Sequence, residues 1–324
     1  MPQSSYQYAV GRIKALETHM LDGNKLRKLA AAEPEDFFKV LQETGYGSGA
    51  LADENLEEMV KKELKEARRL VWEITPEPEI TSLFLLHIDA HNLKVLFKAR
   101  VLEEPAGELL EDGGVFPLEV LEKSVNEKSY MLLPNPLKSG LEELEKMLMR
   151  NISPQTISVS VDTAIFRYIS SIIEDKGSDY AKAYFSVMAD LTNIRSLVRA
   201  RILTWDAEMF ASLVIPGGYI SKDTLISAYS VANEQLALYL NKGPYADKIA
   251  AALEEYVNKG SASAFEKRLD SLLMQLVRSE KNDINGIGPV IGYLLGKEAE
   301  AKAINIIFAA KRRAAEPELP ELYM

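Results

Sequence analysis

The chain has 324 residues, a formal net charge of −10 and no cysteine. The acidic balance argues against nucleic acid as a partner, because phosphate binding requires a basic protein face. The lack of cysteine excludes disulfide scaffolds, thiolate metal sites and cysteine nucleophiles.

The composition also predicts the fold class. Alanine, leucine, glutamate and lysine dominate and β-branched runs are rare, which favours an all-α protein. We expect no signal peptide, and no apolar run approaches the roughly 18 residues that a membrane span requires. The sequence therefore predicts a cytoplasmic protein that lies outside the bilayer.

The first part of the chain has the pattern of a series of amphipathic helices. One helix is predicted to begin near Tyr6 and to be broken by Asp-Gly-Asn at residues 22–24. Another starts at residues 33–36, since proline tolerates the first helical turn and acids suit the positive end of the helix dipole. A longer helix ends at residue 74, before the first of two prolines. The next is predicted to run from about Ile80 to Leu102.

One stretch within that last helix occurs three times. DAHNLKVLFKAR begins at Asp89, returns as DLTNIRSLVRAR at Asp190 and, in eroded form, as EAKAINIIFAAK at Glu300. Apolar residues recur at i, i+3 and i+4 in each copy, which is one face of an α-helix. These residues are Leu93, Leu96 and Phe97, then Ile194, Leu197 and Val198, then Ile304, Ile307 and Phe308. Each copy ends in alanine and a basic residue. The spacing of about 100 residues predicts three related helical units, each with one such signature helix.

Glycine pairs mark the expected joints between these units. Gly113-Gly114 and Gly217-Gly218 follow the first two signature helices at similar intervals, each beside a proline. We therefore predict three similar helical-bundle lobes, over residues 1–112, 113–216 and 217–324. The locally acidic stretch 103–145 is best interpreted as a solvated face around a linker.

Two patterns invite a ligand-binding interpretation that closer inspection does not support. His87 and His91 share a helix face, but Ile88 stands where a zinc metalloprotease carries glutamate, and the second copy has neither histidine. The glycine-rich stretches 45–49 and 286–292 lack the strand–loop–helix context of a phosphate loop. The sequence offers no arrangement in which a nucleophile is paired with a base or two carboxylates are paired with each other. We expect no catalytic, cofactor-binding or metal-binding residues.

A polar pair recurs in the first two signature helices, as Asp89 with Asn92 and as Asp190 with Asn193. Acid and amide lie on one helix face beside the apolar stripe. A buried polar group without a partner costs about 1–3 kcal/mol, so we interpret the pairs as clamps between neighbouring helices. Contact with a partner protein is the alternative. The third copy keeps an acid, Glu300, and loses the amide.

A basic stripe recurs on the same two helices, as Lys94 with Lys98 and as Arg195 with Arg199. Cations in the last turns of a helix complement its dipole and stay solvated, which is the simpler explanation. The alternative is a patch that faces an acidic partner or a neighbouring unit. The third copy lacks the stripe.

Several of these stretches together resemble a known family. YAVGRIKALE at 8–17, TGYG at 44–47, the signature stretches and PVIGYLLGKEAEAKAINIIFAAK at 289–311 resemble the C subunits of bacterial and archaeal V/A-type ATPases (ATP synthases). That family is similar to the d subunits of eukaryotic V-ATPases. The resemblance covers essentially the whole chain. Ala303 departs from the family pattern, in which asparagine is expected.

The resemblance implies three similar all-helical lobes, arranged as a funnel with pseudo-threefold symmetry. It implies a non-catalytic central-stalk (rotor) component, cytoplasmic and peripheral to the membrane, that links shaft subunits D and F to the membrane proteolipid ring. Such a component transmits torque for ATP-coupled proton or sodium transport. The resemblance implies no cofactor and no small-molecule substrate. The residues alone leave an alternative, a free-standing helical-repeat scaffold for another protein partner.

Overall fold

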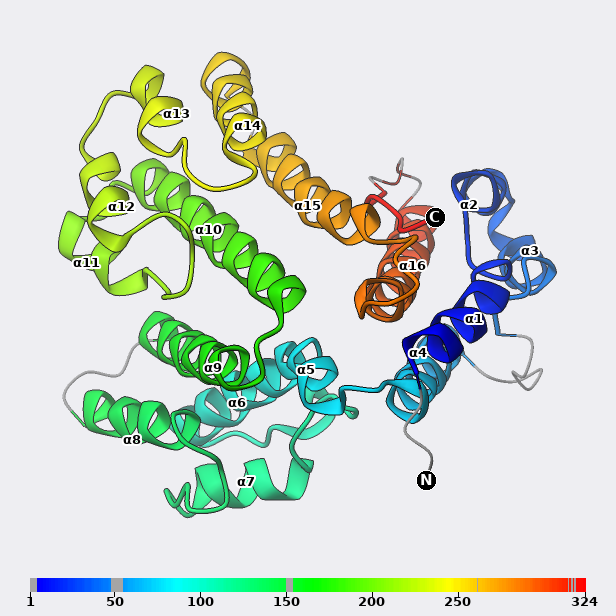
Figure 1. The fold of residues 1–324 in the computed structure, drawn as a ribbon, viewed down its shortest axis with the longest axis horizontal. Helices are drawn as coiled ribbons and strands as arrows, with labels where there is room; N and C mark the ends of the chain where they lie inside the picture. The colour runs from blue at the N-terminus through cyan, green and yellow to red at the C-terminus, as the bar shows by residue number, and fades with distance from the viewer. Residues whose placement is uncertain are drawn as a thin grey trace. The chain divides into compact units, whose positions relative to one another are not determined.

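The computed structural model describes residues 5–47, 55–149, 154–260, 262–313, 315, 317 and 319–324. Within these ranges every regular element is a helix, which confirms the predicted all-α fold. The chain divides into two compact units. The terminal unit comprises Met1–Thr81 with Asp270–Met324, and the internal unit comprises Ser82–Leu269 (Figure 1). The three lobes and their pseudo-threefold arrangement stay predictions.

The terminal unit combines the two ends of the chain. Its helices are α1 (Tyr6–Glu17), α2 (Gly23–Ala31), η1 (Pro34–Asp36), α3 (Phe37–Glu43), α4 (Leu56–Ile74) and α16 (Gly288–Arg312). The helices α5 (Pro78–Leu83) and α15 (Ala262–Ser279) each pass from one unit to the other.

Local sequence explains where the helices of this unit begin and end. The Asp22 side chain accepts hydrogen bonds from the Asn24 and Lys25 N–H groups, which caps α2 at the predicted break. Asn55 and Glu58 form a reciprocal capping box at the start of α4. That helix ends ahead of the first proline, as predicted.

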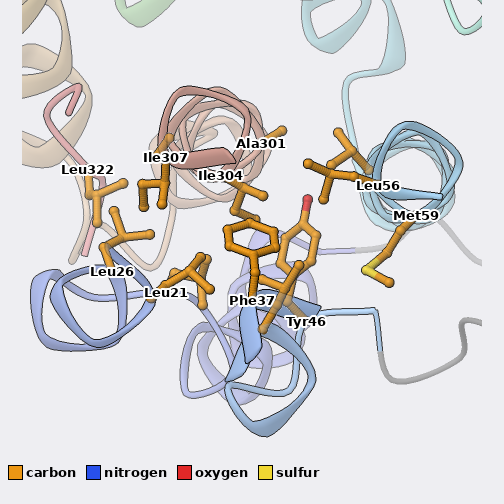
Figure 2. Close-up of a cluster of buried hydrophobic side chains, with 14 residues drawn as sticks. Leu21, Leu26, Phe37, Tyr46, Leu56, Met59, Ala301, Ile304, Ile307 and Leu322 are labelled. Atoms are coloured by element: carbon orange, nitrogen blue, oxygen red, sulfur yellow. The ribbon is translucent and has the colours of Figure 1, made fainter. Parts of the chain in front are cut away.

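The core of the terminal unit joins residues from opposite ends of the sequence. Figure 2 shows side chains of the first 60 residues, among them Leu26 and Phe37, pointing toward Ile304 and Ile307 of α16. The Phe37 and Phe308 rings lie 5.2 Å apart. The core of the N-terminal helices is therefore completed by the last helix of the chain.

The internal unit contains the remaining helices. They are α6 (Leu86–Leu102), η2 (Gly107–Leu109), α7 (Leu118–Asn126), α8 (Leu137–Leu148), α9 (Pro154–Lys176), α10 (Asp179–Ile202), α11 (Ala207–Leu213), α12 (Lys222–Tyr229), η3 (Asn233–Gln235), α13 (Leu236–Tyr239) and α14 (Ala246–Lys259). The signature stretches lie on α6, α10 and α16.

The phase predicted for the signature helices is confirmed. Leu93, Ile194 and Ile304, at equivalent positions, are each fully buried. The start of the first signature helix was predicted wrongly, because α5 and α6 are separate helices. Phe84 lies in the break and packs its ring 4.9 Å from those of Tyr184 and Phe185. This aromatic packing overrides the continuous helical pattern of the sequence.

Helix α9 bears on the expectation that no apolar run is long enough to span a membrane. Among the described helices it alone is long and apolar enough to cross a membrane by length and composition, and 39% of its most apolar window is buried within the protein. Core helices share this composition. Charged residues interrupt it, including Asp162 and Arg167.

Candidate functional site

The polar pair of α6 holds the loop that follows this helix. Asp89 is fully buried, and its carboxylate accepts hydrogen bonds from the Val115 N–H at 2.7 Å and the Phe116 N–H at 3.0 Å. The Asn92 amide donates to the Glu111 carbonyl and accepts from the Glu111 N–H, both at 2.8 Å. Four hydrogen bonds thus fix one short loop against the helix.

The polar pair of α10 makes the same set of bonds. Asp190 accepts hydrogen bonds from the Tyr219 and Ile220 N–H groups, each at 3.0 Å. Asn193 donates to the Ile215 carbonyl at 3.0 Å and accepts from the Ile215 N–H at 2.9 Å. Both pairs therefore bind the backbone of a loop further along the chain, between η2 and α7 for the first pair and between α11 and α12 for the second.

The glycine pairs leave room for the clamps, which are the hydrogen bonds of the two polar pairs to the loop backbone. A Cβ atom on Gly114 would lie 2.6 Å from Asp89 Oδ1, and one on Gly218 would collide with Asp190 Oδ1 in the same way. The preceding glycines, Gly113 and Gly217, adopt φ values of 93° and 97°. Both glycine pairs, which the sequence suggested as joints, lie inside the clamps.

In the third copy, the acid of α16 binds a residue near the N-terminus of the chain. Glu300 is 1% exposed, and its Oε1 accepts a hydrogen bond from the Leu21 N–H at 2.6 Å. The buried ammonium of Lys297 lies 3.0 Å from Glu300 and 3.2 Å from Glu63. Ala303, at the position of the amide, is fully buried and carries no polar group. The carboxylate of the clamp is retained, and a buried ion pair accompanies it.

The basic residue at the end of each signature helix forms a second contact of the repeat. In all three copies it donates to carbonyl groups at the C-terminal end of a short helix, which is α7 for Arg100, α12 for Arg201 and α2 for Lys311. Arg100 donates to the Val125 carbonyl, Arg201 to those of Ala228 at 3.3 Å and Val231 at 2.7 Å, and Lys311 to those of Ala30 at 2.7 Å and Ala32. The sequence showed that each signature stretch ends in a basic residue, but no role was assigned to that residue. Its presence in all three copies was the feature that could have indicated a shared contact.

Two members of the basic stripe bind acids within the internal unit. Lys94 lies 2.6 Å from Asp162 of α9, and Arg199 lies 3.3 Å from Glu266 of α15. Burial raises the pKa of Asp162, and the charge of Lys94 opposes this shift. The other two members, Lys98 and Arg195, are half-buried on the same helices. Contact of the stripe with another protein stays a prediction.

The two histidines of α6 bind backbone carbonyl groups. His87 Nδ1 lies 2.9 Å from the Phe84 carbonyl oxygen, and His91 Nε2 lies 2.8 Å from that of Leu109. Among the residues that the structure describes, no group of three acidic or histidine side chains could hold a metal ion.

Comparison with known proteins identifies the family of the chain. Residues 9–321 match the family described as ATP synthase (C/AC39) subunit. The chain belongs to this family. It is a non-catalytic component of an A/V-type rotary ATPase.

Individual relatives cover most of this ATPase component. The C subunit of the A-type ATP synthase of Methanocaldococcus jannaschii is 26% identical, over 97% of this chain and 84% of the relative. The C subunit of the V-type sodium ATPase of Enterococcus hirae is 24% identical, over 80% of this chain and 79% of the relative. The C subunit of the A-type ATP synthase of Pyrococcus abyssi is 24% identical, over 97% of this chain and 88% of the relative.

The two clamp carboxylates of this ATPase component have raised pKa values. Burial raises the pKa of Asp89 and of Asp190 to about 6, against the opposing effect of the donating backbone N–H groups. The usual value is 3.8. Each carboxyl group therefore binds its proton more tightly in the folded chain. Its contribution to stability is complete below pH 3.8 and is lost as the pH rises through about 6.

This shift predicts the pH dependence of a clamp variant. We expect Asp190→Asn to destabilise the protein, because the amide would turn an N–H donor toward a backbone N–H donor. The deficit grows on acidification from neutral pH, by at most about 1.4 kcal/mol for each pKa unit, since only the wild type gains stability by binding the proton. Urea unfolding at several pH values measures this difference.

The exposed variant Glu174→Gln serves as the control for this experiment. Its difference from the wild type should stay small, because the side chain is exposed. A deficit of Asp190→Asn that shrinks on acidification would contradict the raised pKa.

Proposed function

We propose that this protein is the rotor adaptor of its rotary ATPase. In this role it binds the central shaft subunits D and F and the membrane proteolipid ring, and it transmits torque between them. It would lie on the cytoplasmic side, peripheral to the membrane, and serve ATP-coupled proton or sodium transport. The observation that carries the proposal is the family match over residues 9–321.

The structure supports a mechanical role. Backbone hydrogen bonds from Asp89 and Asp190, together with the basic helix ends, tie loops and short helices to the signature helices. Buried and fully satisfied polar contacts of this kind rigidify a protein. A torque adaptor requires rigidity and large contact surfaces rather than reactive side chains.

A reconstitution experiment tests the proposal. The complete ATPase complex and a complex that lacks this chain are placed in vesicles, and ATP hydrolysis and ion transport are measured together. We expect the incomplete complex to hydrolyse ATP without transporting ions, because shaft and ring are then not connected. Adding back the purified chain should restore transport.

Adding back the exposed-surface variant Lys302→Ala provides a control and should restore transport equally. Ion transport that is unchanged without the chain would favour the alternative, a free-standing helical-repeat scaffold. Binding assays with the D–F heterodimer and with the isolated ring complete the test.

A further inference from the structure

A cavity lies among the helices of the internal unit. It has a volume of about 670 Å³ and is lined by α8, α9, α11 and the start of α12 (Figure 1). All of these elements belong to the internal unit. The volume falls within the range of roughly 300–1,000 Å³ that is typical of small-molecule sites. We call this cavity the α9 trough.

One face of α9 forms the longest wall of the trough. The lining residues of this helix recur every four positions, at 155–156, 159–160, 163–164 and 167. This spacing keeps them on one face of a helix. At 1.5 Å per residue, the wall that they form is about 18 Å long. The trough is therefore elongated along α9.

The interior of the trough is mainly apolar. On one side α8 and α9 pack closely, since a Cβ atom on Gly140 would lie 2.5 Å from that of Ala164. Large apolar side chains of three helices line the rest, namely Met147, Val159, Met209 and Leu213. Helix α9 is apolar enough to span a membrane, yet the chain buries only 39% of its most apolar window. Uncovered apolar surface is unfavourable in water, which indicates a ligand on this face.

The charged residues of the trough lie at its exposed edge. Arg167 and Lys222 are exposed cations. Of the lining residues that the structure describes, only Glu143 is acidic, and its carboxylate lies 3.1 Å from Arg167. Two cations against one carboxylate leave the edge positive, although the whole chain carries a net charge of −10. Such an edge attracts an anionic group, whereas the interior suits hydrocarbon.

The size and the walls of the trough argue against a peptide. Two turns of an α-helix, about 10 Å across and 5.4 Å in pitch, fill a cylinder of roughly 850 Å³. This exceeds the volume of the whole trough. An extended peptide needs hydrogen-bond partners for its backbone, whereas the walls are helices whose backbone groups bond within the helix. A hydrocarbon chain has no such requirement.

We propose that the α9 trough binds a long-chain fatty acid. Its hydrocarbon chain lies along α9 against Met147, Val159 and Leu213, and its carboxylate lies at the positive edge near Arg167 and Lys222. A ligand with one anionic end and an otherwise apolar body matches both parts of the trough. The inference does not depend on the proposed rotor function.

Equilibrium dialysis of the purified full-length chain against radiolabelled dodecanoate, below its micelle concentration, tests the inference. We expect saturable binding of dodecanoate and weaker binding of the uncharged analogue dodecanol. Val159→Trp should abolish binding, because this half-buried side chain lines the trough and the larger ring fills it. Arg167→Ala combined with Lys222→Ala should raise the Kd for dodecanoate by about tenfold and leave that for dodecanol unchanged.

Matched controls lie outside the trough. Glu174→Trp places the same ring at an exposed position of α9, and Lys182→Ala with Lys242→Ala removes the same charge from exposed positions. Both should keep the wild-type Kd, and circular dichroism establishes that the variants are folded. If Val159→Trp does not fold, the two charge variants decide, and equal Kd values for them overturn the inference.

Three further outcomes would also overturn it. The first is a wild type without saturable binding of dodecanoate. The second is a folded Val159→Trp variant that binds dodecanoate as the wild type does. The third is displacement of dodecanoate by the D–F heterodimer, or dimerisation of the chain that dodecanoate reverses, since either would assign the α9 trough to a protein partner.

Discussion

Replacing Leu197 with aspartate is expected to lower the free energy of unfolding by more than about 4 kcal/mol, because it places a carboxylate on a fully buried helix face. Leu197 lies on the apolar stripe of α10, between the clamp residues and the basic end of the helix. The same change at Leu96 of α6, which is 5% exposed, should have a similar effect. Urea unfolding followed by circular dichroism measures both.

Two further variants make this result interpretable. Leu197→Ala removes only apolar contacts and should cost about 2–5 kcal/mol, which remains measurable if the aspartate variant does not fold. Arg199→Ala changes an exposed ion pair on the same helix and should cost about 0–1 kcal/mol. An unchanged melting temperature for Leu197→Asp would show that the apolar stripe does not face the core.

Replacing Lys297 with alanine is expected to cost about 3–5 kcal/mol, because Glu63 and Glu300 then share a buried site without a cation. Lys297 is 8% exposed, and its ammonium also lies 5.0 Å from the centre of the Tyr46 ring. Burial lowers the pKa of Lys297, but the two carboxylates reverse this effect and raise the pKa above its usual value. The lysine is therefore charged in the folded protein.

Lys302→Ala is the matched control on the same helix. Its ion pair with Asp270 is long, at 3.8 Å, and both side chains are more than half exposed, so the variant should cost at most about 1 kcal/mol. Adding Glu300→Gln to Lys297→Ala should recover part of the lost stability, because it removes one of the unbalanced charges. Equal losses for Lys297→Ala and Lys302→Ala would contradict a buried ion pair.

The signature helices could be predicted because their pattern is local. The apolar positions recur at i, i+3 and i+4, and the helix period places them on one face whatever surrounds it. Leu93, Leu197 and Ile307 are accordingly all fully buried. The break before Leu86 was missed because it depends on the packing of Phe84 against aromatic rings of α10, about 100 residues further along the chain.

The partners of the polar pairs could not be predicted in the same way. Asp89 and Asp190 bind backbone N–H groups, which every residue except proline carries and which leave no mark in the sequence. The glycine pairs were visible in the sequence, but the sequence suggested only joints between units. Their close approach to the carboxylates could be seen only in the three-dimensional structure. The bond between Glu300 and Leu21 spans nearly the whole chain, and no local pattern links the two.

The partners of the basic stripe could not be predicted from the sequence either. Lys94 belongs to a stripe that recurs in the sequence, yet its ion pair with Asp162 depends on how α6 and α9 pack. Helical periodicity determines which face of a helix carries a residue, but not which neighbouring helix that face meets.

The shared core of α2, α3, α4 and α16 constrains how the protein folds during its synthesis. The partners of Leu26 and Phe37 in this core, Ile304 and Ile307, are translated about 270 residues later. At a synthesis rate of roughly 5–20 residues per second, this interval is on the order of 14–54 seconds. The residues of the internal unit emerge from the ribosome before α16 and can fold as a unit, and until α16 is made the N-terminal helices keep apolar faces uncovered. Chaperones that shield nascent chains would therefore be needed chiefly by the first 80 residues.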